Sequence, residues 1–176
     1  MAANMQSLAA RLTRGEESAF AELYDACADR LYGYLLSWLH DADGASDVLQ
    51  ATFVRAVQNR KRFAKVENPV AYLFQMARNE ALRTVRREKR RPERKATNYA
   101  EEKYSVAPAA HDDAEMAAAA LAKLNRDDRE ILELKIYAGL TFQEIAQTTG
   151  QPAATVATRY RRALEALRPW LAKQLR

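Results

Sequence analysis

The chain has 176 residues, of which 48% are apolar and 29% are charged, and its net charge is +5. A chain of this length forms one compact domain or two small ones. Five glycines and five prolines are too few for an all-β sandwich or barrel, and one cysteine with two histidines excludes disulfide frameworks, Cys/His zinc sites and Cys–His catalysis.

We expect no targeting signal in the first residues. Charge appears at Arg11, too early for the apolar segment of a signal peptide, and the sequence has no run of about 18 apolar residues to span a bilayer. The sequence therefore predicts a cytoplasmic protein without membrane insertion.

Two helices are expected in the first third of the chain. Between Glu17 and Leu39, apolar residues recur at steps of three and four, which is typical of a helix with one buried face. This face consists of Phe20, Leu23, Tyr24, Cys27, Leu31, Tyr34, Leu35 and Trp38. Cys27 is accordingly interpreted as a small core residue. A break is predicted to end this helix at Gly44, with Ser46 or a neighbouring aspartate capping a second helix.

A loop and a third, basic helix follow. Residues 61–69 lack periodicity and end in Asn-Pro, which fits an N-cap and a first helical position. The third helix is expected to run from Pro69 to Pro92. Between Arg78 and Lys95 the chain has nine basic and three acidic residues. Such a run favours an acidic partner such as nucleic acid, although a solvated helix end would look similar.

The predicted fold class is all-α, with two small helical domains joined by a flexible linker. Residues 92–112 have no apolar stripe and contain two prolines, which predicts the linker. The expected domains are residues 1–91 and 113–176.

The sequence predicts a helix-turn-helix in the second domain. Asn125 and the acids after it start a helix whose expected core residues are Ile131, Leu132, Leu134 and Ile136. Thr141 and Glu144 form a capping box that opens a short helix, Gly150 ends it, and a last helix follows to about Leu167. A plain helical hairpin would show a similar turn.

The helical wheel of the last helix favours DNA binding. One face is apolar and consists of Val156, Tyr160, Ala163, Leu164, Leu167 and Leu171. The opposite face carries Ala154, Thr155, Thr158, Arg161, Arg162 and Glu165, with Arg159 at its flank. Arginines that reach base edges or phosphates, with small residues where the backbone approaches the duplex, are typical of a recognition helix.

Four segments in order resemble the extracytoplasmic-function (ECF) sigma factors of bacterial RNA polymerase. They are DVLQATF at 47–53, AYLFQMARN at 71–79, LTFQEIA at 140–146 and TVATRYRRAL at 155–164. The resemblance implies a promoter-specificity factor with a sigma domain 2 that binds core polymerase and the −10 element, and a sigma domain 4 that binds the −35 element. It implies core polymerase (β and β′ subunits), promoter DNA and an anti-sigma factor as partners.

The resemblance also implies three sets of site residues. Those on the polymerase-binding helix are Asp47, Gln50, Phe53 and Arg55. Those at the −10 element, where strands open, are Phe63, Asn68, Tyr72, Arg78, Asn79, Arg83, Arg86 and Arg87. Those at the −35 element are Ala154, Thr155, Thr158, Arg159, Arg161 and Arg162.

Two rival functions fit the sequence less well. A helix-turn-helix regulator that does not replace the sigma factor would carry a sensory or receiver domain with strands, which the first 90 residues do not indicate. An enzyme would need clustered carboxylates or metal ligands, and Asp41, Asp43 and Asp47 are better explained by capping. No catalytic residue, metal or cofactor is expected.

Overall fold

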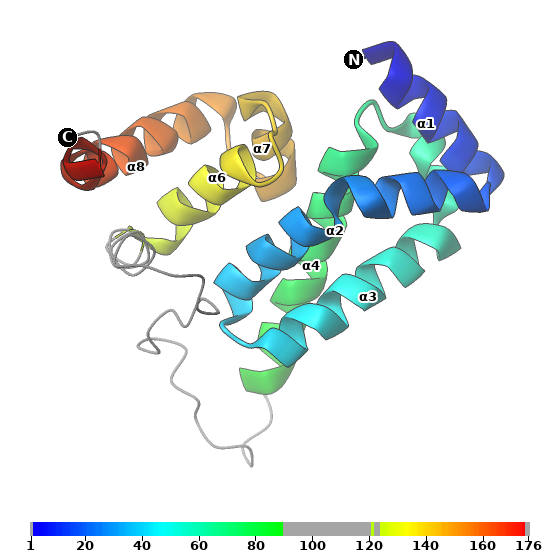
Figure 1. The fold of residues 1–176 in the computed structure, drawn as a ribbon, viewed down its shortest axis with the longest axis horizontal. Coiled ribbons are helices and arrows are strands. Elements are labelled where there is room, and N and C mark those ends of the chain that lie inside the picture. Colours follow the sequence, from blue (N-terminus) through cyan, green and yellow to red (C-terminus); the bar gives the residue numbers. More distant parts are fainter. Residues whose placement is uncertain (1, 90–120, 122–123, 175–176) are drawn as a thin grey trace. The chain divides into compact units, whose positions relative to one another are not determined.

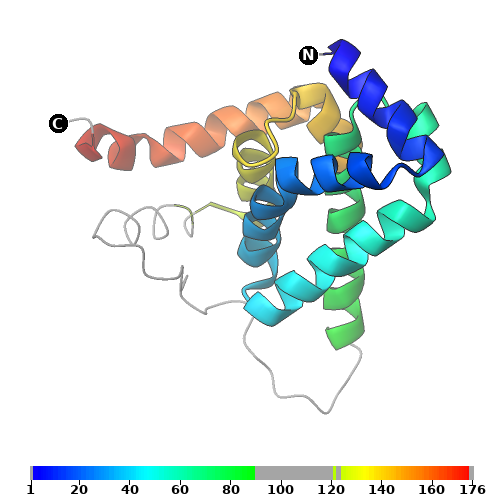
Figure 2. The same cartoon turned by 45° about the vertical axis from the view of Figure 1, so that its right-hand side comes forward.

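The computed structural model describes residues 2–89, 121 and 124–174, and every regular element among them is helical (Figures 1 and 2). The all-α prediction is therefore confirmed. The chain divides into two compact units, Met1–Thr97 and Asn98–Arg176. The predicted linker at 92–112 lies outside the described residues, and the predicted domain boundaries stay predictions.

The first unit contains four α-helices and one 3-10 helix. These elements are α1 (Ala2–Arg14), α2 (Glu17–Leu39), α3 (Ala42–Gln58), the 3-10 helix η1 (Arg60–Lys65) and α4 (Pro69–Lys89). Helices α2, α3 and α4 pack against one another. Their core contains fully buried large side chains: Leu23, Leu31, Tyr34, Leu35, Leu73 and Phe74.

Helix α1 was not predicted from the sequence, and it packs mainly against η1 (Figures 1 and 2). Its buried residues are Leu8, Ala9 and Leu12. Arg11 fixes the corner after α1, because its guanidinium donates to the Glu16 carboxylate at 3.1 Å and to the Glu22 carboxylate at 2.6 Å. Gly15 turns the chain at φ +83°, a conformation that favours glycine.

The break between α2 and α3 is shorter than predicted. His40, with φ 53°, ends α2, and the carboxylate of Asp41 caps α3 by accepting from the N–H of Gly44 at 3.1 Å. The prediction that the break extends to Gly44 is therefore wrong. Gly44 lies inside α3, where a Cβ would stand 2.6 Å from the Asp41 carboxylate.

The predicted buried face of α2 is confirmed at most of its positions, including Cys27. Tyr24 is the exception, because 48% of this residue is exposed. The Cys27 thiol donates to the carbonyl of Leu23 at 2.8 Å, and burial raises the pKa of the thiol to about 11.

The second unit contains α6 (Arg126–Ile136), α7 (Phe142–Thr149) and α8 (Ala153–Gln174). Helices α6 and α7 both pack on α8. The core of this unit contains residues that are completely or almost completely buried: Ile131, Leu132, Leu134, Leu140, Ile145, Val156 and Ala163. The prediction that Ile136 lies in the core is wrong, because this last residue of α6 is 64% exposed.

The caps of the second unit are confirmed. Asn125 accepts from the N–H of Asp128 at 3.0 Å, and Thr141 and Glu144 form both bonds of a capping box. Gly150 ends α7 at φ +73°. Within the described residues, no helix of either unit is long and apolar enough to cross a bilayer.

Candidate nucleic-acid interface

Helix α4 carries the first group of predicted DNA contacts. Tyr72, Asn79, Arg83 and Arg86 share one face by helical spacing, and Arg87 lies next to it. Asn79, Arg83, Arg86 and Arg87 are exposed. The exposed Arg83 guanidinium lies 3.4 Å from the Glu80 carboxylate, a long contact that contributes little. The exposed turns of α4 therefore present cations to solvent.

Arg78 has different surroundings from the other arginines of α4. Its guanidinium carbon lies 5.9 Å from the ring centroid of Trp38 on α2, within the range of a cation–π contact. This contact directs Arg78 toward α2 rather than along the row formed by Asn79, Arg83 and Arg86.

Phe63 of η1 is fully buried rather than presented to a base. Its ring meets the Phe20 ring edge-on at 6.3 Å and the Tyr72 ring at 5.3 Å. A direct stacking contact with DNA would require this ring to leave the core, so in this structure Phe63 anchors the loop. Asn68 accepts from the N–H groups of Val70 and Ala71 and thereby caps α4.

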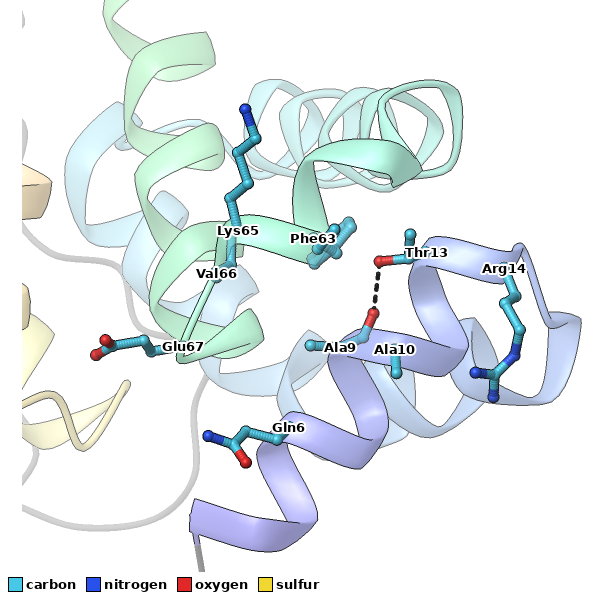
Figure 3. Close-up of a pocket in the computed structure, with 10 residues that line it drawn as sticks. Gln6, Ala9, Ala10, Thr13, Arg14, Phe63, Lys65, Val66 and Glu67 are labelled. Atoms are coloured by element: carbon cyan, nitrogen blue, oxygen red, sulfur yellow. Dashed lines mark hydrogen bonds between the residues drawn. The ribbon is translucent and has the colours of Figure 1, made fainter.

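An open depression of about 670 Å³ lies between α1 and η1 (Figure 3). Gln6, Ala9 and Thr13 line it from α1, and Phe63 and Val66 line it from the side of η1. The Thr13 hydroxyl donates to the carbonyl of Ala9 at 2.8 Å, so it is satisfied within its own helix. The packing of α1 against η1 around this depression supports the loop that leads into α4.

Helix α3 carries the second group of predicted site residues, those expected to bind the polymerase. Asp47 and Gln50 are exposed, and the half-buried Phe53 ring lies 4.9 Å from the ring of Tyr24. Val54 and Val57 are 51% and 46% exposed. Sequence reasoning missed the contribution of Tyr24 and Val54, because helical periodicity alone assigned Tyr24 to the core. We call Tyr24, Asp47, Gln50, Phe53, Val54 and Val57 the α3 surface.

Arg55 does not join the α3 surface. It lies on another side of α3, where its guanidinium pairs with the Glu80 carboxylate of α4 at 3.2 Å. This pair ties α3 to α4.

Helix α8 carries the third group, and its faces follow the prediction with one exception. Ala154, Thr158, Arg161 and Arg162 are exposed, whereas Thr155 and Arg159 are half-buried. The Thr158 hydroxyl donates to the carbonyl of Ala154 at 2.9 Å. On the opposite side Val156, Ala163 and Leu167 are buried, but Leu164 is 37% exposed. Leu171 lies where no side chain is described.

Two of these arginines converge on one buried carboxylate of α6. Arg162 donates from Nε and Nη2 to the two oxygens of Asp128 at 2.5 and 2.6 Å. Arg159 donates from Nη1 to Asp128 at 3.3 Å and lies 3.0 Å from the Asp127 carboxylate. Sequence reasoning missed this cluster, because Asp127 and Asp128 were explained by the helix dipole alone.

Asp128 is charged at neutral pH despite its burial. Burial would raise the pKa of this carboxyl, but hydrogen bonds from Arg162 and Asn125 outweigh it and hold the pKa below its ordinary value. The Asp128 side chain is 2% exposed, whereas that of Arg162 is 57% exposed. The cluster therefore joins a buried anion to an exposed cation.

The exposed side chains of these surfaces are of the kinds that bind nucleic acids and proteins. The described residues contain no group of three or more His, Cys, Asp or Glu side chains that could hold a metal ion. They offer exposed cations on α4 and α8 and exposed apolar side chains on α3. Cations of this kind meet phosphates and base edges, and apolar patches of this kind meet proteins.

Comparison with protein families gives two matches, one in each unit. The family described as sigma-70 region 2 matches residues 23–91. The family described as sigma-70 region 4 matches residues 114–167. The first match contains α3, η1 and α4, and the second contains α6, α7 and most of α8.

Relatives of known name match along nearly the whole chain. RNA polymerase sigma factor CarQ of Myxococcus xanthus is 30% identical over 92% of this chain and 94% of its own. ECF RNA polymerase sigma factor SigK of Mycobacterium ulcerans is 28% identical over 94% of this chain and 92% of its own.

Solved structures agree with the fold. The sigma factor RpoE of Bartonella quintana, solved with the anti-sigma factor NepR, has a TM-score of 0.72 and 25% identity, covering 87% of this chain and 96% of that one. CnrH, solved with the cytosolic domain of CnrY, has a TM-score of 0.65 and 22% identity, covering 96% of this chain and 97% of that one. The CnrH likeness supports the fold alone.

Proposed function

The chain belongs to the ECF group of sigma-70 factors, which direct RNA polymerase to promoters, and from this premise we propose how its two units share that task. The first unit binds core polymerase through the α3 surface and holds the −10 element against α4. The second unit binds the −35 element through α8. The alternative, a regulator that leaves the resident sigma factor in place, is not favoured, because the first unit matches sigma-70 region 2.

One observation supports the −10 assignment above the others. Asn79, Arg83, Arg86 and Arg87 form a row of exposed polar and cationic side chains along the helix that leaves η1. A cationic groove along the backbone is what a separated strand requires. Phe63 is proposed to act there as the anchor of η1, with Asn68 and Tyr72 fixing the start of α4. Arg78 is proposed to hold α4 against α2 through Trp38.

The α3 surface is proposed to bind the polymerase. Tyr24, Val54 and Val57 expose apolar area beside the polar Asp47 and Gln50, and such an apolar patch with a polar rim is typical of a protein interface. The family resemblance points to the clamp helices of β′ as its counterpart and to the β flap tip for the second unit. Arg55 is proposed to support this surface through Glu80.

An anti-sigma factor is proposed as a further partner. The similar RpoE was solved with NepR, which is named as its anti-sigma factor. Because sigma factors initiate transcription without catalysing a reaction themselves, we also propose that this chain has no enzymatic activity and acts in the cytoplasm, where RNA polymerase works.

The test is transcription by core RNA polymerase with and without the full chain, on a promoter library, followed by sequencing of the transcripts. We expect initiation from a restricted set of promoters. Absence of any chain-dependent transcript, together with absence of binding to core polymerase, would contradict the proposal.

Arg86→Glu tests the −10 assignment on the same reconstituted enzyme. We expect it to slow promoter opening, measured by permanganate reactivity, and to lower the slope of log affinity against log salt by at least about 1, because a phosphate contact is lost. Arg30→Glu is the matched control, since Arg30 is an exposed arginine on α2. Equal slowing by both variants would show that net charge alone is responsible.

A further inference from the structure

The contact between Asp128 and Arg162 has a geometry that goes beyond joining two helices. A guanidinium has five N–H donors in a planar fork. Arg162 uses its Nε and Nη2 edge on the two oxygens of Asp128, at 2.5 and 2.6 Å. The donors of Nη1 and the second donor of Nη2 form a further edge, which makes no hydrogen bond within the described residues. The planar group is thus held along one edge and left open along another.

Asp128 is itself held rigidly. It is the third residue of α6. Its backbone N–H donates to the side-chain oxygen of Asn125 at 3.0 Å, and the Asn125 amide donates to the Asp128 carboxylate at 2.8 Å. Its side chain is 2% exposed. A long arginine side chain loses much rotamer freedom when it binds. A fixed carboxylate removes that freedom before any DNA arrives.

We propose that Asp128 is a positioning residue that orients Arg162 of α8 for one defined donor contact with −35 DNA, and that it thereby sets base preference rather than bulk affinity. This proposal rests on the proposed −35 role of α8. Bidentate donation to guanine uses two parallel N–H bonds from one edge of the fork, and Arg162 leaves one such edge open. Arg159, which shares Asp128 and Asp127, is the second and weaker member of the cluster.

Removal of the Asp128 carboxylate should change non-specific affinity and base discrimination in opposite directions, which makes the proposal testable. A carboxylate beside the DNA-binding face repels phosphates, so its removal strengthens non-specific binding. If Asp128 orients Arg162, its removal also weakens discrimination at the base that Arg162 contacts. A carboxylate that only joined α6 to α8 would not change base preference in a protein that stays folded.

Asp128→Asn and the matched Asp127→Asn are compared as full chains bound to core polymerase. Asp127 is adjacent, its side chain is 51% exposed, and its ion pair is with Arg159 rather than Arg162. The readout is the ratio of affinities for the best −35 duplex and for its single-base variants, the best duplex being the one selected from a random library by the wild-type enzyme. We expect Asp128→Asn to lower that ratio about fivefold or more at one base pair, the loss of one bidentate contact. Asp127→Asn should leave the ratio at that base pair unchanged, because the ion pair of Asp127 is with Arg159.

Loss of folding is separated from loss of positioning by two further measurements. Thermal unfolding of each variant sets a temperature at which it is fully folded, and the affinity ratio is measured there. In an Arg162→Ala background, Asp128→Asn should lower the ratio no further, because Asp128 acts through Arg162. An unchanged ratio in Asp128→Asn, or an equal extra loss in the Arg162→Ala background, would overturn the proposal.

The same assay distinguishes this inference from the proposed function. If wild-type enzyme shows no −35 preference at all, the assignment of α8 to the −35 element fails and the inference fails with it. If wild-type enzyme discriminates and Asp128→Asn retains that discrimination, the inference alone fails.

Discussion

Ion pairs in this chain differ in value according to how deeply one partner is buried. The Asp128 side chain is 2% exposed and receives both donors of one Arg162 edge, whereas the Glu80 side chain is 19% exposed and its pair with Arg83 is 3.4 Å long. Removing Arg162 would leave the buried Asp128 charge uncompensated, while exposed pairs contribute little. Substitution of Asp128 removes the buried charge and its contact with Arg162 together, and is therefore the more informative experiment.

Acid should weaken the second unit through Asp128. The pKa of this carboxyl is lower in the folded than in the unfolded chain, so its contribution to stability is complete above the unfolded pKa, about 4, and is lost as the pH falls through the folded pKa. We expect the difference in urea midpoint between wild type and Asp128→Asn to shrink as the pH is lowered below about 4. A difference that stays constant down to pH 2 would contradict this.

At the level of elements, local chemistry predicted the helix starts better than the helix faces. Asn125, Thr141 and Asn68 all cap as expected, because a side-chain acceptor placed before a helix acts within a few residues. Tyr24 and Ile136 were wrongly placed in the core, since a helical wheel does not show which positions of a face the neighbouring helices cover. Helix α1 was missed altogether, because its support comes from η1, about 50 residues further along the chain.

The capping box of α7 gives a prediction at this level. Thr141→Ala removes the oxygen that accepts the N–H of Glu144, and we expect unfolding of the second unit to become easier by about 1 kcal/mol. Urea denaturation of the full chain measures this. Gln143→Ala is the control, because Gln143 is exposed in the same turn and is not the capping residue. Equal losses in both variants would mean that helix propensity, and not the cap, is responsible.

For the whole molecule, the sequence predicted two helical units and the residue types at their surfaces, but not how these residues are engaged. Arg161 and Arg162 look alike in the sequence, yet only Arg162 is held by a carboxylate of another helix. Phe63 was expected to reach DNA and is instead buried between Phe20 and Tyr72. Such partners come from distant parts of the chain, and spacing along one helix carries no information about them.

Cys27 provides a probe of how the two units unfold. It is the sole cysteine, it lies in the first unit, and burial raises the pKa of its thiol to about 11, so it should react slowly with alkylating reagents near pH 8. Each unit has its own core, and we therefore expect Thr141→Ala to leave the alkylation rate unchanged. Mass spectrometry measures the rate. Faster alkylation in Thr141→Ala would show that the units unfold together.

The ion pair between Asp128 and Arg162 also bears on protein engineering. Its two halves are 34 residues apart, in α6 and α8. Transplanting only the outer face of α8 from a relative would bring in a new arginine without its carboxylate, or leave Asp128 buried opposite a neutral side chain. Chimeras intended to redirect this factor to new promoters should exchange residues 125–164 as one block.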